Sequence, residues 1–309
     1  MIIMEKFDVI VRVPGSTANL GSGFDCIGMA LQLYTTIRMK KAHDPIIKLK
    51  GNNLEGISTN PDNLVYKVAQ LIFNKANIEC PNFEIEIESE IPLTRGLGSS
   101  AAAIVGAMAA ANVLAGNPFK TSELYQFATE LEGHPDNVGS SLLGGIVIGT
   151  WDQSKVSYIR VLPPKDIKAV VAIPNFELST KLARDVLPNF YSMRDTVHAI
   201  SHSALLASAL VSGDTSVLYE AMKDRIHQPY RTNLIPGMDI LLENSQQYGA
   251  LGIALSGAGP TIIALTNKEN KRLEDYMHTV LLEHGVSSSI TTLKPDVDGI
   301  TIQSFVNNL

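Results

Sequence analysis

The sequence predicts an α+β protein of two domains. Helix-like and strand-like patterns alternate along the chain, a Pro163-Pro164 pair interrupts it near the middle, and 309 residues are enough for two cores. We place the domains at 1–164 and 165–309. Hydrophobic residues make up 45% of the chain and the net charge is −6, which argues against binding of nucleic acid through a basic surface.

Cysteine content and the N-terminal residues bear on the compartment. Cys26 and Cys80 are too few for a disulfide framework and are typical of a reducing environment. Residues 1–7 lack the basic start, apolar core and small-residue cleavage site of a secretion signal. The Ala-rich segment that begins at Ser99 is too weakly hydrophobic for a membrane span. We therefore expect a cytoplasmic protein that binds neither a membrane nor nucleic acid.

The first residues alternate between apolar and polar, which indicates a strand over 7–13 that ends at Pro14. Residues 15–28 are rich in Gly, Ser, Thr and Asn and predict a long, exposed loop. Two further strands in a hairpin-like arrangement are expected within 29–50. Residues 38–41, between them, are basic and predict a solvated turn.

Apolar spacing predicts an amphipathic helix over 63–76, with Asn63 as its cap. A half-exposed strand over 83–88 follows, and the segment 99–116 predicts a buried helix that ends in a glycine. Another helix starts at Thr121. Residues 144–150, flanked by glycines, predict a buried strand.

The second domain begins with a buried strand over 168–174. Helices and strands then alternate as in an α+β sandwich. The expected helices are 192–212, 216–227, 236–248 and 269–284, and the expected strands are 249–255, 261–266, 287–293 and 299–305.

The central motif lies between strand 83–88 and the Ala-rich helix. It reads Pro92-Leu93-Thr94-Arg95-Gly96-Leu97-Gly98-Ser99-Ser100-Ala101-Ala102. Glycines let the backbone approach a ligand closely, and the free N–H groups of the helix start face an anion. Ser99 and Ser100 can cap the helix or bind Mg²⁺. The pattern favours phosphate binding, and its alternative is an ordinary capped helix after a tight turn.

Polar groups gather at two other places in the first domain. Asn19 and Asp25 lie in the predicted 15–28 loop, where their alternative role is turn formation. The end of the helix that starts at Thr121 is rich in carboxylates and also carries a histidine; a solvated helix end is the alternative to a Mg²⁺ or anion site. Its polar residues are Glu130, Glu132, His134, Asp136 and Asn137.

In the second domain, Thr180 and Arg184 are four residues apart and would share one helix face, where they could bind an anion together. Arg231 lies in a proline-bounded loop and has the side chain best shaped for a carboxylate. The spacing of His198 and His202 suits zinc, but no third ligand accompanies them, so we interpret them as surface residues.

Three of these segments, 14–25, 92–102 and 256–261, resemble the signature motifs of the GHMP kinase superfamily, the kinases of galactose, homoserine, mevalonate and phosphomevalonate. Within it, Ala18-Asn19-Leu20-Gly21, Gly23-Phe24-Asp25 and Glu132-Gly133-His134-Pro135-Asp136-Asn137-Val138 are most similar to the homoserine kinases. The resemblance covers nearly the whole chain. Ser22 and Gly15 depart from the usual Pro and Ala, but both stay small.

The resemblance implies an N-terminal domain like the second domain of ribosomal protein S5 and a ferredoxin-like C-terminal domain. It also implies ATP- and Mg²⁺-dependent phosphorylation of the side-chain hydroxyl of L-homoserine, in threonine biosynthesis. ATP would lie along Pro92, Leu93, Thr94, Arg95, Gly96, Leu97, Gly98, Ser99, Ser100, Ala101 and Ala102, with Asn63 near the adenine. Ser99 or Ser100 with Glu132, or with Glu130 as the alternative, would hold Mg²⁺.

Homoserine would be surrounded by Asn19, Asp25, His134, Asp136, Thr180, Arg184 and Arg231. Homoserine is a zwitterion, so carboxylates near its ammonium and guanidinium groups near its carboxylate agree with that assignment. Asn137 stands where mevalonate-type relatives carry a catalytic Asp. Because Asn137 cannot take a proton, we expect catalysis by positioning and charge neutralisation, with Asn19, Asn137 and Arg184 as the catalytic group.

Two other functions remain open from the residues: a kinase of the same fold for mevalonate or shikimate, and a regulator of the same fold without turnover. Another alcohol without an ammonium group would leave Asp25 and Asp136 unmatched, which disfavours it. Inhibition by threonine, which resembles the substrate, and assembly into a homodimer are further expectations.

Overall fold

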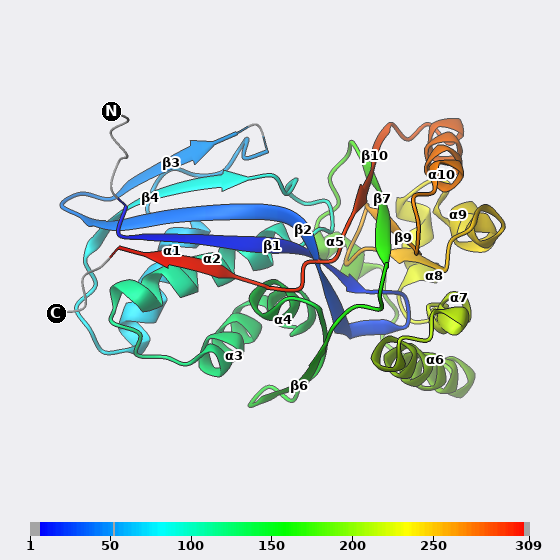
Figure 1. Ribbon diagram of the computed structural model, residues 1–309, viewed down its shortest axis with the longest axis horizontal. Coiled ribbons are helices and arrows are strands. Elements are labelled where there is room, and N and C mark those ends of the chain that lie inside the picture. Colours follow the sequence, from blue (N-terminus) through cyan, green and yellow to red (C-terminus); the bar gives the residue numbers. More distant parts are fainter. Residues whose placement is uncertain (1–6, 52, 306–309) are drawn as a thin grey trace.

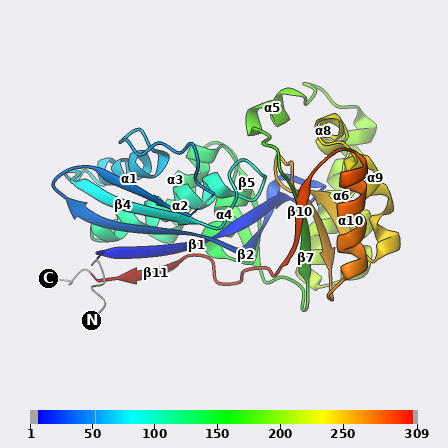
Figure 2. The same ribbon diagram turned by 90° about the horizontal axis from the view of Figure 1, so that it is seen from above.

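The computed structural model describes residues 7–51 and 53–305, so most of the N-terminal segment 1–7 lies outside the described part. Figure 1 shows a larger sheet with its helices beside a smaller sheet with its own helices. In Figure 2 the helices of the larger sheet all lie on one of its faces. No helix in the described ranges is long and apolar enough to cross a membrane.

The larger sheet has the strand order β11-β1-β2-β4-β3, and β5 pairs with both β2 and β6. Its strands are β1 (Val9–Asn19), β2 (Gly23–Ala42), β3 (Ile46–Lys50), β4 (Asn82–Ser89), β5 (Ile146–Trp151), β6 (Val156–Val161) and β11 (Thr301–Ser304). The helices on it are α1 (Leu64–Lys75), α2 (Ser99–Leu114), α3 (Thr121–Glu132) and α4 (Asp136–Leu143).

The Ala-rich helix α2 packs directly on β1 and β2 because its side chains are small. A methyl group on Gly106 would lie 2.8 Å from the Cδ1 of Ile37 and 3.0 Å from a methyl of Val13. Ala101, Ala107 and most other members of α2 are fully buried. This close packing fixes the start of α2, and with it the segment that precedes it, against the sheet.

The smaller sheet is antiparallel and has the order β10-β7-β9-β8, made of β7 (Lys168–Pro174), β8 (Gly252–Leu255), β9 (Ile262–Thr266) and β10 (Ser288–Leu293). Taken along the chain, strands and helices follow the βαββαβ pattern of ferredoxin-like domains. Its helices are α5 (Thr180–Asp185), α6 (Met193–Ser212), α7 (Leu218–Ala221), α8 (Gln228–Arg231), α9 (Met238–Asn244) and α10 (Lys271–Glu283).

The predicted loop over 15–28 was wrong. β1 continues past Pro14 to Asn19 and β2 begins at Gly23, so only a short turn separates them. The register shifts between Pro14 and Gly15, which accommodates a residue without an N–H group. The turn is also buried: a methyl group on Gly21 would lie 1.8 Å from the carbonyl oxygen of Met222. Packing against the second domain therefore overrides the loop-like composition.

The hairpin-like arrangement within 29–50 was also wrong, because β3 pairs in parallel with β4 rather than with β2. The basic run 38–41 lies inside β2 and is not a turn. Arg38 forms an ion pair with Glu86 at 2.9 Å, and Lys40 forms one with Glu84, also at 2.9 Å, across the β2–β4 pair. Cross-strand charge matching explains the basic run.

In the second domain the predicted strands and the two longest helices agree with the structure within a few residues. The predicted helix 216–227 is wrong in extent, since only α7 and a short 3₁₀ turn form there, and 236–248 ends as a 3₁₀ turn after α9. The domain ranges stay a prediction, with one departure: β11 lies within 165–309 but pairs with β1 of the larger sheet.

Candidate active site

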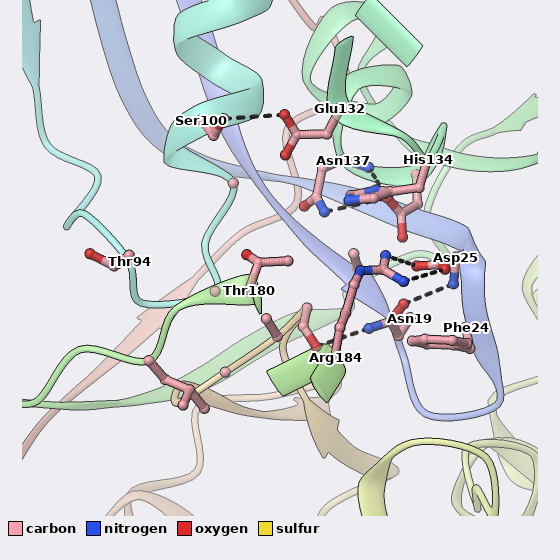
Figure 3. Close-up of a pocket in the computed structure, with 18 of the residues that line it drawn as sticks. Asn19, Phe24, Asp25, Thr94, Ser100, Glu132, His134, Asn137, Thr180 and Arg184 are labelled. Carbon is pink, nitrogen blue, oxygen red and sulfur yellow. Dashed lines mark hydrogen bonds and ion pairs between the residues drawn. The ribbon is translucent and has the colours of Figure 1, made fainter. Parts of the chain in front are cut away.

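A cavity lies where the two domains meet. Four parts of the first domain reach it: the end of β1 with the start of β2, the segment before α2, the start of α2, and the α3–α4 junction. The second domain contributes α5, α8 and the glycine segment 257–259. The cavity collects these predicted site residues: Asn19, Asp25, Thr94, Gly96, Gly98, Ser99, Ser100, Glu132, His134, Asp136, Asn137, Thr180, Arg184 and Arg231. Figure 3 shows most of them.

Several residues predicted to contact ATP do not reach this cavity with their side chains. The guanidinium of Arg95 donates to the carbonyl oxygens of Pro174 at 3.0 Å and Leu93 at 3.1 Å, so a contact of Arg95 with ATP stays a prediction. These bonds attach the glycine-rich segment before α2 to the end of β7. The side chains of Leu97, Ala101 and Ala102 are buried in the core beneath this segment. Pro92 lines neither this cavity nor the second cavity, which is described below.

Two glycines shape the segment before α2. Gly96 and Gly98 have φ of 75° and 72°, in the left-handed region. A Cβ on Gly96 would lie 2.2 Å from the Ser256 carbonyl oxygen, and one on Gly98 would lie 2.2 Å from the Ser16 hydroxyl. A side chain at Gly96 would therefore push this segment away from Ser256, and a side chain at Gly98 would push it away from Ser16.

The start of α2 faces the cavity. Gly98, rather than a serine, is its N-cap, so the predicted capping role of Ser99 and Ser100 was wrong and their hydroxyls are not used for that purpose. The first N–H groups of a helix have no carbonyl partner within the helix, and the positive end of the dipole lies there. The arrangement suits a phosphate group.

Ser100 and Glu132 meet across the cavity wall, with the Ser100 hydroxyl 3.1 Å from a Glu132 carboxylate oxygen. Burial raises the pKa of Glu132, so a cation beside it would be stabilised. Glu130 points elsewhere, 3.5 Å from the Lys75 ammonium. The donor set of hydroxyl and carboxylate beside a helix start therefore fits Mg²⁺, and it favours Glu132 over Glu130.

Asp25 and Arg184 form a bidentate pair between the two domains. The guanidinium nitrogens of Arg184 lie 2.8 and 3.0 Å from the two Asp25 oxygens. Asp25 has a left-handed φ of 54°, and its N–H donates to the Asn19 side chain at 3.0 Å. Thr180 lies one turn before Arg184 on α5, and both face the cavity as predicted.

Asn19 acts as a connector between the domains. Its amide nitrogen donates to the Gly257 carbonyl oxygen at 2.9 Å, while its amide oxygen accepts from Asp25. Asn19 is buried, with a φ of 73°. Both the nitrogen and the oxygen of the Asn19 amide thus bond to other groups of the protein. A direct contact of Asn19 with substrate stays a prediction.

His134 and Asp136 form a buried pair, with His134 Nδ1 and Asp136 Oδ1 2.5 Å apart. Burial lowers the pKa of His134, but the charge and hydrogen bond of Asp136 outweigh that effect and raise it to about 9. The histidine is therefore a cation at neutral pH. The same carboxylate oxygen accepts from the Asn137 backbone N–H at 2.6 Å.

Two serines that sequence reasoning missed fix the amide of Asn137. The Ser16 hydroxyl donates to the Asn137 side-chain oxygen at 3.0 Å, and the Ser141 hydroxyl donates to Ser16 at 3.2 Å. The amide nitrogen of Asn137 donates to Asp136 Oδ1 at 3.3 Å. Asn137 lines the cavity, and its amide is thus held in one orientation there. Small hydroxyl residues in the 15–28 segment were the one available signal.

Arg231 is buried, with 2% of its surface exposed. It donates to the carbonyl oxygens of Ala183 at 2.8 Å and Gly257 at 3.1 Å, and to His227 Nδ1 at 3.1 Å. Burial, with the charge of nearby Arg184, lowers the pKa of Arg231 to about 10. Arg231 remains charged at neutral pH.

Phe24 and His227 are further residues that sequence reasoning missed. Their rings stack with centroids 4.9 Å apart, and the Phe24 ring lies 5.6 Å from the Arg184 guanidinium carbon and 5.5 Å from that of Arg231. The Phe24 ring thus holds both guanidinium groups beside the cavity. Phe24 adjoins Asp25 in the sequence motif, but nothing in the sequence alone indicated this packing.

A second, largely apolar cavity of about 380 Å³ adjoins the first and shares Thr94, Ser99 and Ser100 with it. Asn63 lines it, and its place near the adenine stays a prediction. Its amide oxygen accepts from the Val65 N–H at 2.8 Å, which confirms the predicted helix cap, and its amide nitrogen donates to the Ser58 carbonyl oxygen. The Asn63 side chain therefore helps to fix this wall of the cavity by bonding to the backbone of Ser58 and Val65.

Asp25, His134 and Asp136 bring possible ligand atoms within 4.8 Å of one another. This group differs from the predicted metal set of Ser99, Ser100 and Glu132. Asp136 is bonded to a cationic histidine and Asp25 to Arg184, so we interpret the group as an ion-pair network. His198 and His202, the other possible pair, stack at 3.6 Å without a third ligand in the described part of the chain.

Comparison with known proteins agrees with this geometry. Residues 63–145 match the family of GHMP kinases N terminal domain, and residues 206–279 match GHMP kinases C terminal. The chain therefore belongs to the GHMP kinase family.

Among its members, the chain is similar over nearly its full length to proteins named homoserine kinase. The one from Deinococcus radiodurans is 42% identical over 295 residues, which is 95% of this chain and 96% of that protein. The one from Caldicellulosiruptor saccharolyticus is 40% identical over 96% of this chain and 97% of that protein.

Solved structures agree. The crystal structure of homoserine kinase from Cytophaga hutchinsonii matches with a TM-score of 0.86 at 27% identity, over 98% of this chain and 100% of that one. The mevalonate kinase of Methanococcus jannaschii matches with a TM-score of 0.66 at 19% identity, over 93% of this chain and 98% of that one, and shows the shared fold alone.

Proposed function

We propose that this protein is a homoserine kinase, which transfers the terminal phosphoryl group of ATP to the side-chain hydroxyl of L-homoserine. The observation that carries the proposal is the full-length similarity to homoserine kinases at about 40% identity. The cavity supports it, because the motif residues from both domains line one space beside the start of α2.

The charges of the cavity suit a zwitterion. The cavity is lined by three carboxylates and three cations, so its formal charges cancel before substrate enters. The carboxylates are Asp25, Glu132 and Asp136, and the cations are Arg184, Arg231 and His134. A neutral zwitterion preserves that balance. The expectation that Asp25 and Asp136 would be unmatched by an alcohol without an ammonium group was wrong, because both already have partners within the protein.

In this proposal the substrate exchanges partners with the protein. The homoserine ammonium would approach Asp25 and Asp136, and its carboxylate would approach Arg184, Thr180 and Arg231. Its hydroxyl would then lie between Asn137 and the start of α2, where the phosphate is held. Holding both reactants in this geometry removes most of the entropic cost of their encounter.

Asn137 would donate from its amide nitrogen to an oxygen of the reacting groups and could not accept a proton. A strong base is not obligatory when the transition state of phosphoryl transfer is loose, because the hydroxyl loses its proton late. The proton would pass to the transferred phosphate or to water. Rate acceleration then rests on positioning and on the cations Arg184 and His134.

Mg²⁺ would be held by Glu132 and by the hydroxyl of Ser99 or Ser100, where the raised pKa of Glu132 marks a carboxylate that gains from a nearby cation. When bound, the ion neutralises phosphate charge. ATP would place its phosphates at the start of α2 and its base in the apolar second cavity.

Three finer points belong to the same proposal. A cytoplasmic location agrees with the use of ATP. Threonine, which shares the charged end of homoserine, would compete for the same pocket, so its inhibition would be competitive with homoserine and not uncompetitive. The protein would also form a homodimer, since twofold dimers are the commonest soluble oligomers.

The test is release of ADP measured with a coupled assay, with homoserine, serine, threonine, mevalonate and shikimate offered in parallel. We expect turnover with homoserine to exceed that with each of the others by at least about 100-fold in kcat/KM, because an alcohol without the charged ends and chain length of homoserine would not hold its hydroxyl in the reacting geometry. Comparable turnover with mevalonate or shikimate would replace the substrate assignment. Tight ATP binding without ADP formation from any alcohol would indicate a regulator.

A further inference from the structure

His227 has no exposed surface and lies where the second domain meets the turn between β1 and β2. Both nitrogens of its ring are engaged. Nε2 lies 2.9 Å from the Gly21 carbonyl oxygen, and Nδ1 lies 3.1 Å from Nη1 of Arg231. The Phe24 ring stacks on one face, with an angle of 18° between the two ring planes. The His227 ring thus connects Arg231 with two residues of the first domain.

These partners permit one protonation state of the ring. A carbonyl oxygen only accepts, so Nε2 must carry the proton that bonds to Gly21, and a guanidinium only donates, so Nδ1 must keep its lone pair toward Arg231. A second proton, on Nδ1, would point at an N–H group. Burial, aided by the charge of Arg231, lowers the pKa of His227 despite the carboxylates of Asp224 and Asp25. The ring is therefore neutral at pH 7.

The Arg231 guanidinium is held on two of its three nitrogens. Nε donates to the Ala183 carbonyl oxygen at 2.8 Å, and Nη1 donates both to the Gly257 carbonyl oxygen at 3.1 Å and to His227. Nη2 makes no hydrogen bond to any residue in the described ranges, and Arg231 lines the cavity. A guanidinium has five N–H groups, so the two on Nη2 are the donors that Arg231 has left for a ligand.

We propose that His227 is a positioning residue for Arg231, and that its neutral ring keeps Nη2 of the guanidinium directed at the carboxylate of the substrate. The inference rests on the proposed function, which identifies that carboxylate as the one of homoserine. The guanidinium cannot rotate without breaking one of its three bonds to the protein. Two of the acceptors are backbone carbonyls, so His227 is the one whose acceptor belongs to a side chain. Support of this kind is what holds a binding group in its productive geometry.

The same ring fixes Arg231 relative to the other end of the proposed substrate site. Gly21 and Phe24 lie four residues and one residue before Asp25 in the chain. His227 bonds to the first of them and stacks on the second. The carboxylate proposed for the ammonium and the guanidinium proposed for the carboxylate are therefore connected through one rigid, buried ring.

Asp224 fixes His227 in turn. The Asp224 side chain is only 1% exposed. Its two oxygens accept from the backbone N–H groups of Ile226 at 2.8 Å, His227 at 2.9 Å and Gln228 at 2.7 Å. The backbone on both sides of the histidine is thus held at the start of α8. The ring has little freedom to follow Arg231 if that side chain moves.

Two substitutions separate the two edges of the ring. In His227→Asn the amide oxygen takes the place of Nδ1 and can still accept from Arg231, but no group reaches Gly21. In His227→Gln the amide takes the place of Nε2 and can still donate to Gly21, but no acceptor faces Arg231. The first variant keeps the bond that the proposal requires, and the second loses it.

Steady-state kinetics of ADP release gives the first readout. We expect His227→Gln to raise the KM for homoserine by about 10- to 100-fold, because a buried donor of Arg231 loses its acceptor. The kcat and the KM for ATP should stay within about threefold, since the bond to Gly21 remains. His227→Asn should keep the KM for homoserine within about threefold of the wild type. His278→Gln is the matched control on the exposed side of α10 and should behave as the wild type.

A second measurement needs no substrate. Nitrogen-15 NMR of the full-length protein labelled in histidine reports the tautomer, and the His227 signals are assigned by their loss in His227→Asn. We expect a proton on Nε2 and none on Nδ1 at pH 7.

The proposal would be overturned by a proton on Nδ1, by equal rises in the KM for homoserine in the two His227 variants, or by a fall in kcat without a change in that KM. Absence of homoserine turnover in the wild type would overturn the proposed function instead. In that case the tautomer would still decide whether His227 holds Arg231.

Discussion

The Asp25 carboxylate of the first domain accepts two hydrogen bonds, at 2.8 and 3.0 Å, from the Arg184 guanidinium of the second. The two residues were expected to hold opposite ends of one substrate, yet they hold each other. In the proposed function the pair would preorganise the cavity, since each group would already lie where a charged group of homoserine binds. Substrate binding would then be an exchange of ion pairs rather than a burial of bare charges.

The variant Arg184→Lys tests the bidentate pair of Arg184 and Asp25. A lysine keeps the charge but cannot make two parallel hydrogen bonds to a carboxylate, so we expect kcat/KM for homoserine to fall by about 100-fold. The KM for ATP should change little. Arg225→Lys is the matched control, because Arg225 forms a single looser contact with Asp195 at 3.6 Å, away from the cavity. Equal losses in the two variants would contradict the role given to Arg184.

Glu132→Gln tests the metal assignment. The amide keeps the shape of the side chain but removes the charge, so the Mg²⁺ concentration for half-maximal activity should rise by about 10- to 100-fold. Glu130→Gln, two residues away, serves as the control and should leave that concentration unchanged, since Glu130 contacts Lys75. If Glu130→Gln raised the Mg²⁺ concentration for half-maximal activity instead, Glu130 rather than Glu132 would be the metal ligand.

Asn137→Ala tests catalysis by positioning. Removing one preorganised donor should lower kcat by about 100-fold while the KM values for both substrates stay within a few-fold. Asn137→Asp places a carboxylate where a donor stood and should also lower kcat. Complete loss of activity in Asn137→Ala with normal binding of both substrates would show that the residue takes part in the chemistry more directly than proposed.

We expect the free energy of unfolding to depend on pH through the buried His227. Burial lowers its pKa below the ordinary value near 6.5, and the ring stays neutral, donating from Nε2 to the Gly21 carbonyl oxygen at 2.9 Å. Because the folded pKa is depressed, the unfolded chain binds the extra proton first. The stabilising contribution is therefore present above about pH 6.5 and is lost as the pH falls.

Urea unfolding from pH 7 to pH 5 measures this effect. The free energy of unfolding of the wild-type protein should fall more steeply than that of His227→Gln, by up to about 1.4 kcal/mol per pH unit, the slope for one proton. Identical slopes for the wild type and His227→Gln would mean that His227 does not titrate on unfolding.

Local patterns predicted the second domain well. β7 is a run of buried apolar residues with clear ends, and α6 begins and ends within a residue of the range expected from its spacing. Helix α2 and the glycines before it also followed from composition. In each case short-range signals in the sequence agree with the final fold.

Long-range packing explains what the sequence could not reveal. Residues 15–28 have the composition of a loop, but most of them belong to β1 and β2, and the short turn between these strands packs against Met222. Arg95 belongs to the glycine-rich motif before α2 by position, yet its guanidinium donates to Pro174 at the end of β7. Ser16 and Phe24 matter through neighbours more than 100 residues away, Asn137 and His227, so no local pattern could identify them.

The most direct test of the central claim is phosphorus NMR of a reaction that contains the protein, ATP, Mg²⁺ and L-homoserine. One new phosphomonoester signal should appear, coupled to two protons of the homoserine C4 methylene and equal in amount to the ADP formed. ADP formed without that signal, or an equal yield of phosphomonoester when mevalonate replaces homoserine, would contradict the assignment.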